Sequence, residues 1–513
     1  MLALLFYDKS LLMPDNTELE QLQKQLVALQ AQVDELQQDN LALNTRIAQL
    51  LAELKLSKSK KYGKQSEKGP RGTFNEAEQA QSESTPNHHK KGKRTLPANL
   101  PREDVDHKLT DTDCVCCGEQ MHICGTEESE QVKIIPAKIS VIKHRQFKYS
   151  CRHCEHTELS NKIVTAPKPK QPIPGSMASP ETLAAVVTAK YCDAVPLNRQ
   201  VEVFKRGGLT LSRGTLANWC IQASHILKPL VVAMQQHLLA QHSICADETR
   251  VQVLDEPDKT ATSQSYMWVY RSNEMSKQPV VIYDYQAGRG RACLMTFLGD
   301  YQGYLQCDGY KVYENIANVI AVSCWAHARR KYDEALKAES KNKGRGHKAI
   351  SFIGKLYRLE AQAKKKNLTS EERYQLRQEK AKPILAAFKH WLDETQTKVT
   401  KKSYIGIAIE YTINQWDKLI RYIEDGELGI DNNITERDIR PFTTGRKNWM
   451  FSQSVNGAEA SAIFYSIVMT CRANDINPYY YFRHLFKALP NLGEGSDVSD
   501  FLPWNVQLDF DSS

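Results

Sequence analysis

A heptad repeat near the amino terminus constrains the fold more than any other feature of this sequence. Leucine occupies every d position from Leu22 to Leu50, and the a positions from Leu26 to Leu54 are apolar except for Asn40. Leucine at d with a single asparagine at a favours a parallel two-stranded coiled coil. We therefore expect residues 15–56 to form a leucine zipper that makes the protein a dimer. The alternative is an amphipathic helix packed on its own domain, although such helices usually carry a broader apolar stripe.

The segment after the zipper is first basic and then polar. Six lysines and one glutamate lie between Lys55 and Lys68, and they could hold DNA phosphates or simply be a solvated run of charge. Residues 69–99 are rich in polar residues and have no apolar period, so residues 57–105 are predicted to be a basic and disordered linker. The net charge of +8 is modest for 513 residues, but its clustering indicates a polyanionic partner, of which nucleic acid is the leading candidate.

The sequence also bears on the compartment. No run of 18 apolar residues occurs, and the first twelve residues lack the basic leader of a secretion signal. We expect a cytoplasmic protein with no membrane association, and residues 1–12 are assigned no function. Because the cytosol keeps thiols reduced, the thirteen cysteines are not expected to form disulfides, and paired cysteines are interpreted first as metal ligands.

Two C-x-x-C pairs predict a structural zinc site. Cys114 and Cys117 form the first pair, and Cys151 and Cys154 form the second. Two such pairs close a tetrahedral site around Zn²⁺ without an open position for chemistry. We expect a zinc ribbon in residues 106–165 that is structural or contacts DNA. Unligated surface cysteines are the alternative, and the other candidate ligands nearby are Cys116, Cys124, His153 and His156.

Residues 178–235 are predicted to form a helical domain with a helix-turn-helix. Gly207 and Gly208 interrupt the helical pattern, and Ser212 is a suitable N-cap for a second helix that includes Trp219. The second helix of such a motif usually enters the major groove of DNA, which makes Arg213 a candidate DNA contact. A plain helical hairpin would give the same pattern.

From about residue 243, short β-rich segments alternate with helices, one of them expected near residues 291–298, and this predicts a mixed α/β sheet. Asp247 lies on the first strand, and Asp308 lies at the end of the fourth. These two strands are neighbours in a ribonuclease H-like sheet, so the carboxylates can share a pair of metal ions. Cleavage of a phosphodiester needs such a cluster, because one ion activates the attacking oxygen and the other stabilises the leaving oxygen.

A third acid is expected beyond a helical insertion at about residues 335–428, within a catalytic domain at residues 240–472. Asn432 or Asn433 can cap a short helix that carries Glu436. Basic neighbours that suit a metal and phosphate site are Arg437, Arg440, Arg446 and Lys447. Acids that could be mistaken for ligands are Glu248, Asp255, Glu427, Asp431 and Asp438.

Four motifs together resemble the insertion sequence 66 transposase family, namely ADET, QCDGY, CWAHARRK and DNNITERDIRPFTTGRKNW. The likeness extends almost end to end, from the zipper with its KYGKQSEK tail to the C-terminal NPYYYFRHL and LPWN. That family uses an Asp, Asp, Glu catalytic triad. The matching residues here are Asp247, Asp308 and Glu436, and none of them is substituted.

The resemblance implies a DNA transposase that binds terminal inverted repeats and target DNA at the bacterial nucleoid. It would act as a homodimer or higher synaptic oligomer, with or without accessory proteins of the same element. Mg²⁺ or Mn²⁺ would support attack of water on a phosphodiester, and the freed 3′-hydroxyl would then attack target DNA. Residues 473–513 are a C-terminal segment with no assigned role.

The motif CWAHARRK leaves several interpretations open. Arg329 and Arg330 are candidate DNA contacts. Cys324 and His327 could bind a metal, but packing at a strand-to-helix turn is the favoured interpretation. Two rival functions remain. One is a catalytically silent DNA-binding protein, against which the intact acids argue. The other is a structure-specific nuclease on the same fold, which would not need the upstream sequence-reading modules.

Overall fold

The computed structural model describes residues 16–62, 139–150, 163–338, 344–493 and 495–508. By contacts, the chain divides into a larger unit and a smaller unit, the latter made of residues 64–144 and 207–209. The described helices and strands belong to the larger unit. The four cysteines of the predicted zinc site and most of the predicted linker lie outside the described residues.

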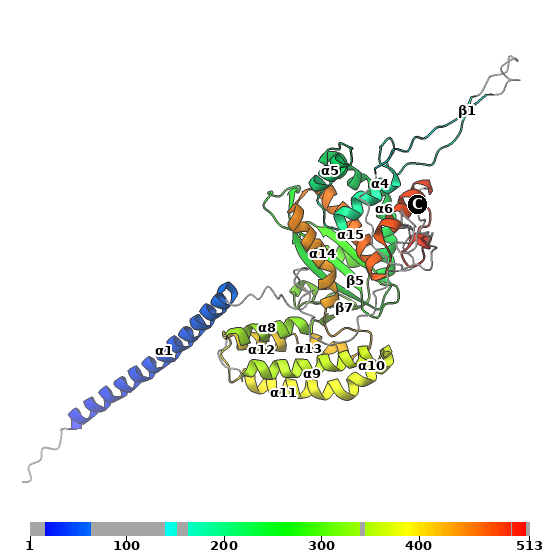
Figure 1. The fold of residues 1–513 in the computed structure, drawn as a ribbon. Coiled ribbons are helices and arrows are strands. Elements are labelled where there is room, and N and C mark those ends of the chain that lie inside the picture. Colours follow the sequence, from blue (N-terminus) through cyan, green and yellow to red (C-terminus); the bar gives the residue numbers. More distant parts are fainter. Residues whose placement is uncertain (1–15, 63–138, 151–162, 339–343, 494, 509–513) are drawn as a thin grey trace, which may run out of the picture. The chain divides into compact units, whose positions relative to one another are not determined.

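A five-stranded mixed sheet lies in the catalytic region (Figure 1). Asp247 is on its central strand, and Asp308 directly follows the neighbouring strand. Strand β3 is central, with β5 antiparallel on one side and β7 parallel on the other, and β6 and β8 form the edges. The prediction of a mixed α/β sheet with adjacent first and fourth strands is confirmed. The bounds are β3 Ser243–Val251, β5 Ser265–Ser272, β6 Val281–Gln286, β7 Gly303–Cys307 and β8 Val319–Ser323, with α7 at Arg291–Leu298 as expected.

The edge strand β6 is covered by helix α15 (Val455–Ala473). The hydroxyl of Ser466 accepts the backbone N–H of Tyr283 at 2.8 Å, and the hydroxyl of Thr470 accepts that of Val281 at 3.0 Å. An exposed edge strand offers unpaired backbone groups to other chains, and these hydroxyls satisfy them internally. Helix α15 therefore closes this edge of the sheet.

Three helices precede the sheet: α4 (Pro180–Tyr191), α5 (Leu197–Arg206) and α6 (Arg213–Leu239). The predicted N-cap is confirmed, because the Ser212 hydroxyl accepts the backbone N–H of Thr215 at 3.0 Å. Leu216 and Trp219 on α6 are buried, whereas Arg213 in its first turn is exposed. Between Arg213 and Trp219, the exposed charged side chain of α6 is therefore that of Arg213 in the first turn.

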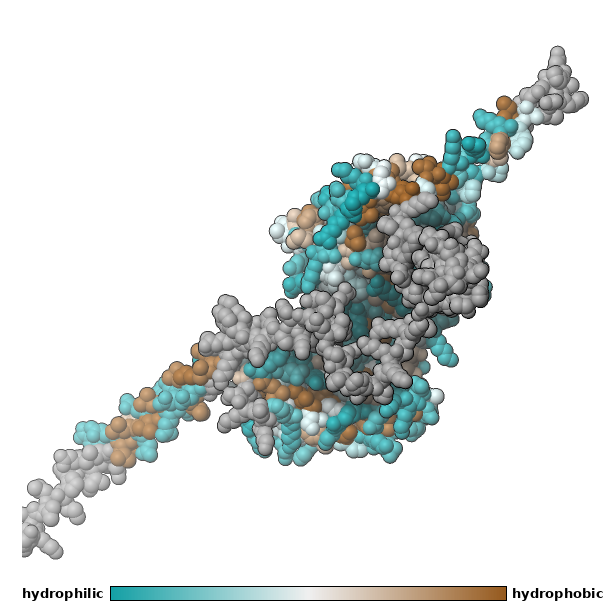
Figure 2. Space-filling model, viewed as in Figure 1, coloured by the Kyte–Doolittle hydropathy of each residue, from teal (hydrophilic) through white to brown (hydrophobic). Residues whose placement is uncertain are grey.

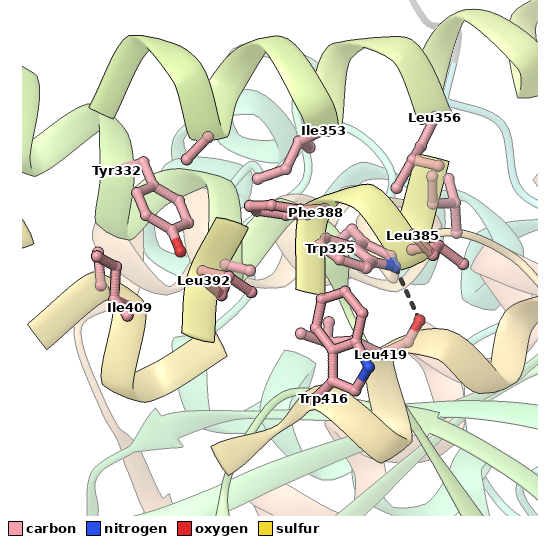
Figure 3. Close-up of a cluster of buried hydrophobic side chains, with 14 of the residues drawn as sticks. Trp325, Tyr332, Ile353, Leu356, Leu385, Phe388, Leu392, Ile409, Trp416 and Leu419 are labelled. Carbon is pink, nitrogen blue, oxygen red and sulfur yellow. Dashed lines mark hydrogen bonds between the residues drawn. The ribbon is translucent and has the colours of Figure 1, made fainter. Parts of the chain in front are cut away.

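The segment after β8 is helical, as predicted for the insertion (Figure 1). Its core is aromatic, and Figure 3 shows Trp325, Phe388 and Trp416 packed together. The indole nitrogen of Trp325 donates to the carbonyl of Leu419 at 2.8 Å, which satisfies the one polar atom of this ring. The helices are α8 Trp325–Ala338, α9 Arg345–Lys365, α10 Ser370–Leu376, α11 Lys382–Gln396, α12 Tyr404–Asn414 and α13 Trp416–Ile420.

Helix α14 (Asn433–Trp449) follows the insertion and carries Glu436. The expectation of a short helix here was wrong, because α14 spans 17 residues and continues through Pro441. Proline removes one backbone hydrogen bond inside a helix. Ile439 and Phe442 are buried on either side of Pro441 in the sequence, and their packing offsets the lost hydrogen bond.

The chain then forms β9 (Ser452–Ser454), which pairs with β4 (Val253–Asp255). The last long helix is α16 (Pro478–Ala488).

Helix α1 (Asn16–Tyr62) confirms that the heptad segment is helical. Its predicted d-position side chains Leu29, Leu36 and Leu43 are between 60% and 63% exposed, and Figure 2 shows hydrophobic residues along this helix. A second copy of the helix would cover this row of leucines. The structure describes one chain, so the dimer stays a prediction. Across the described ranges, no helix has the length and apolarity needed to span a membrane.

Candidate active site

Asp247 and Asp308 are placed by the pairing of β3 with β7. The two strands run parallel, and Cys245 lies opposite Gln306. Continuing this register by two residues puts Asp247 opposite Asp308, at the same edge of the sheet. Residues Ile244 to Ala246 are almost completely buried, so the aspartate is the first residue of β3 at which the strand leaves the core.

Each aspartate has one oxygen held by the backbone. Oδ1 of Asp247 accepts the N–H of Glu248 at 2.8 Å, and Oδ1 of Asp308 accepts the N–H of Tyr310 at 2.9 Å. Within the described ranges, no hydrogen bond is made to the other oxygen of either carboxylate. One oxygen therefore fixes the orientation of each side chain, and the other is available to a ligand.

Glu436 is brought to the aspartates by the start of α14. The side-chain amide of Asn432 donates to the carbonyl of Ala246 at 2.8 Å, and its backbone N–H donates to Sγ of Cys324 at 3.2 Å. Asn432 is buried, and these two bonds attach the helix start to β3 beside Asp247. Asn432 occupies the N-cap position, as one of the two predicted candidates, but its side chain makes no cap hydrogen bond to the helix backbone. Asp431 instead accepts the N–H of Asn433 at 3.1 Å.

The three predicted carboxylates act on one another electrostatically. Burial raises the pKa of Asp247 to about 7, and the negative charges of Glu248, Asp308 and Glu436 contribute to this increase. Carboxylates that repel one another favour a divalent cation, and oxygen ligands suit Mg²⁺ and Mn²⁺. In the part of the chain that the structure describes, no three acidic, His or Cys side chains form a preformed metal-ligand set. The donor chemistry of the three carboxylates fits the metal.

Glu248 neighbours Asp247 in the sequence but has a different role. Its side chain is 1% exposed and forms an ion pair with Arg289, whose Nε donates to it at 2.6 Å. The hydroxyl of Tyr313 donates to the same carboxylate. Glu248 is therefore already satisfied by protein groups.

Most of the other competing acids are also engaged by protein groups. Asp438 pairs with Arg271 in a largely buried ion pair. Asp431 accepts the hydroxyl of Tyr357 at 2.8 Å, and Asp255 accepts the side-chain amide of Gln453 at 2.8 Å. Glu436 also has protein neighbours, but they are more distant, with Arg330 at 3.4 Å and His327 at 3.7 Å. The closer contacts of the competing acids favour Glu436 as the third site acid.

The structure separates the two residues of the C-x-x-H motif. Cys324 is fully buried, and burial raises the pKa of its thiol to about 12, so it packs as expected. His327 in the first turn of α8 instead points at the site, with Nε2 3.7 Å from Oε1 of Glu436. Its Nδ1 is buried and has no hydrogen-bond partner among the described residues. Sequence reasoning left the role of His327 open, and the C-x-x-H spacing was the only signal for it.

The predicted basic residues are distributed over several places. Arg330 lies at Glu436, with Nη2 3.4 Å from both carboxylate oxygens. Arg329 forms an exposed ion pair with Asp333 at 3.8 Å. Of the others, Arg446 donates to the carbonyl of Arg250, and four side chains are exposed: Arg213, Arg437, Arg440 and Lys447.

Family models match three parts of this chain. The model described as "Transposase IS66 family" matches residues 175–460, which is more than half of the chain. The model described as "zinc-finger binding domain of transposase IS66" matches residues 111–155, and the "IS66 C-terminal element" matches residues 466–504. The second match includes all four cysteines of the predicted zinc site.

Curated relatives come from Sinorhizobium fredii (strain NBRC 101917 / NGR234). The uncharacterized protein y4jD is 30% identical over 431 residues, which cover 81% of this chain and 82% of the relative. The uncharacterized protein y4qI is 29% identical over 518 residues and covers 94% of each chain. Asp247 lies on β3, Asp308 directly follows the paired strand β7, and Glu436 lies on the attached helix. With matches along most of its length, this chain belongs to the IS66 family of Asp-Asp-Glu transposases.

Proposed function

We propose that this transposase binds the ends of its own element and catalyses phosphodiester cleavage and strand transfer there, with Asp247, Asp308 and Glu436 as its catalytic carboxylates. The observation that carries the proposal is the convergence of β3, β7 and the start of α14. The pKa of Asp247 is raised mainly by burial, and the smaller contributions of Asp308 and Glu436 support the proposal because they act on this carboxylate. Membership of the family supports the class of reaction.

The chain's own part in the reaction is to hold and orient these groups. Two Mg²⁺ or Mn²⁺ ions bound by the carboxylates would activate the attacking oxygen and stabilise the leaving oxygen. Asp247 and Asp308 keep one oxygen each on a backbone N–H, which presents the other to the site. Arg330 offers its guanidinium beside Glu436, where it can also meet a phosphate oxygen of the substrate.

The other modules would assemble and direct this site on nucleoid DNA. The exposed leucine row of α1 suits a parallel dimer in which paired Asn40 side chains set the register. The two C-x-x-C pairs would hold one structural zinc ion. Helices α5 and α6 would recognise the element end, with the exposed Arg213 in the first turn of α6 facing DNA.

The test is a reaction of the purified full chain with a labelled duplex that carries an element end, a plasmid target and Mg²⁺. The proposal expects cleavage at the end, a free 3′-hydroxyl, and joined product. A silent DNA-binding protein would bind the end and leave it intact. A structure-specific nuclease would cut branched DNA of any sequence without joining. Either result would replace the proposed function.

A further inference from the structure

A cavity of about 530 Å³ is lined by the carboxyl end of α4, by the end of α15 and by α14, the helix that also carries Glu436. Figure 1 shows these helices near one another, and contacts join α14 and α15 each to α4. Three arginines line the cavity: Arg437 and Arg440 from α14, and Arg472 from α15. The function described above does not use this cavity.

In the described part of the chain, the arginines of the cavity are not paired with carboxylates at ion-pair distance, although the charge of Arg437 acts on Glu274 and Asp438. None of the three forms an ion pair with a carboxylate within the described ranges, and all three are exposed. Arg472 is held at the cavity by a hydrogen bond from Nη2 to the carbonyl of Cys192 at 3.0 Å. Asp193 is the single carboxylate that lines the cavity, so the lining keeps a net positive charge. The hydroxyl of Thr444 adds a further possible donor.

The cavity adjoins the acidic site along α14. Arg440 lies four residues after Glu436 on α14, so both residues are on one side of the helix and about 6 Å apart along its axis at a rise of 1.5 Å per residue. A substrate strand with its scissile phosphate at Glu436 would therefore continue towards Arg440. Guanidinium groups bind phosphate oxygens through paired N–H donors, which lysines cannot do.

We propose that the cavity lined by Arg437, Arg440 and Arg472 binds a backbone phosphate of the DNA strand next to the scissile position. This inference rests on the proposed function, because it takes DNA as the source of the phosphate. Free inorganic phosphate offers the same chemistry and is the competing source. The cavity would fix the path of the strand and contribute affinity without sequence preference.

The experiment measures how DNA affinity depends on salt for the full chain in EDTA, where no cleavage takes place. The probe is a fluorescein-labelled duplex of arbitrary sequence. Each phosphate contact contributes about 0.9 to the slope of log K against log salt concentration. Because the cavity holds one phosphate, Arg437→Gln and Arg440→Gln should each reduce the slope, by about 1 at most.

The matched control is Arg358→Gln on α9, where the arginine is exposed and forms no ion pair among the described residues. This change should leave the slope near that of the unmodified protein. Arg472→Lys keeps the charge and tests whether the paired donors matter, and it should weaken binding less than Arg472→Gln. Far-UV circular dichroism and the melting temperature show that each variant is folded.

Slopes for Arg437→Gln and Arg440→Gln equal to that of Arg358→Gln, in folded proteins, would overturn the inference. Stabilisation by inorganic phosphate that these variants lose, together with unchanged DNA slopes, would identify free phosphate as the ligand and also reject DNA. The proposed function is decided separately, by cleavage and joining of element ends. Unchanged slopes in a protein that cleaves would therefore reject only the cavity inference.

Discussion

Replacing Asp247 by Asn should stabilise the metal-free protein while removing its response to metal. Asn keeps the shape of the side chain and can still accept the N–H of Glu248, but it carries no charge. The pKa of Asp247 is raised from an ordinary value of 3.8 to about 7 by burial and by neighbouring acids. Ionising this group therefore costs free energy in the folded protein that it does not cost in the unfolded chain.

The magnitude follows from that difference in pKa. At 1.36 kcal/mol per pKa unit, ionised Asp247 lowers the free energy of unfolding by at most about 4 kcal/mol. Since the folded pKa lies above the unfolded one, stability is greatest at acid pH and falls as the pH rises from about 4 to about 7. The Asn variant lacks this loss. The excess stability of Asp247→Asn should therefore grow over this interval and stay constant above it.

Thermal unfolding of the full chain, followed by circular dichroism in EDTA at pH 5 and pH 8, measures this effect. The variant should melt several degrees above the unmodified protein at pH 8, since about 1 kcal/mol shifts the melting temperature by roughly 2–4 °C. Mn²⁺ should raise the melting temperature of the unmodified protein and not that of the variant. A variant that is less stable than the unmodified protein in EDTA at pH 8, or equally stabilised by Mn²⁺, would refute the reasoning.

Three further predictions concern other parts of the chain. Asp438→Asn should leave cleavage intact but lower the free energy of unfolding by about 3–5 kcal/mol, because it leaves the buried guanidinium of Arg271 unpaired. Urea unfolding measures this change, and unchanged stability would contradict the prediction. Asn40→Leu should tighten association and loosen its stoichiometry, and a protein that stays monomeric at micromolar concentration in ultracentrifugation would reject the zipper. Cys151→Ser should remove one zinc ion per chain by elemental analysis and weaken end binding, whereas an unmodified protein without zinc would reject the site.

Features with local causes could be predicted from the sequence. The helix of the heptad segment, the N-cap at Ser212 and the order of the β-rich segments follow from residues close together in the chain. The same β-rich segments placed Asp247 on the first strand and Asp308 at the end of the fourth, and the structure pairs these two strands. Each of these signals is a pattern along the chain itself, so no knowledge of contacts between distant segments was needed.

Features with distant causes could not be predicted. Asn432 bonds to Ala246, which lies 186 positions earlier, and to Cys324, which lies 108 positions earlier. A capping residue and an anchoring residue look alike when only neighbouring residues are considered. The same holds for His327, whose position at Glu436 depends on how α8 and α14 meet. The length of α14 beyond Pro441 likewise depends on tertiary packing rather than on local helix propensity.

Strand cleavage by Glu436→Gln and by Glu427→Gln, on the same labelled element end with Mg²⁺, tests the central claim most directly. Both variants make the same chemical change in neighbouring parts of the chain, but only Glu436 lies with Arg330 and His327 at the aspartates. We predict that Glu436→Gln binds the end and does not cut it, whereas Glu427→Gln cuts it as the unmodified protein does. Full cleavage by Glu436→Gln, or loss of cleavage only with Glu427→Gln, would contradict the assignment of the third carboxylate.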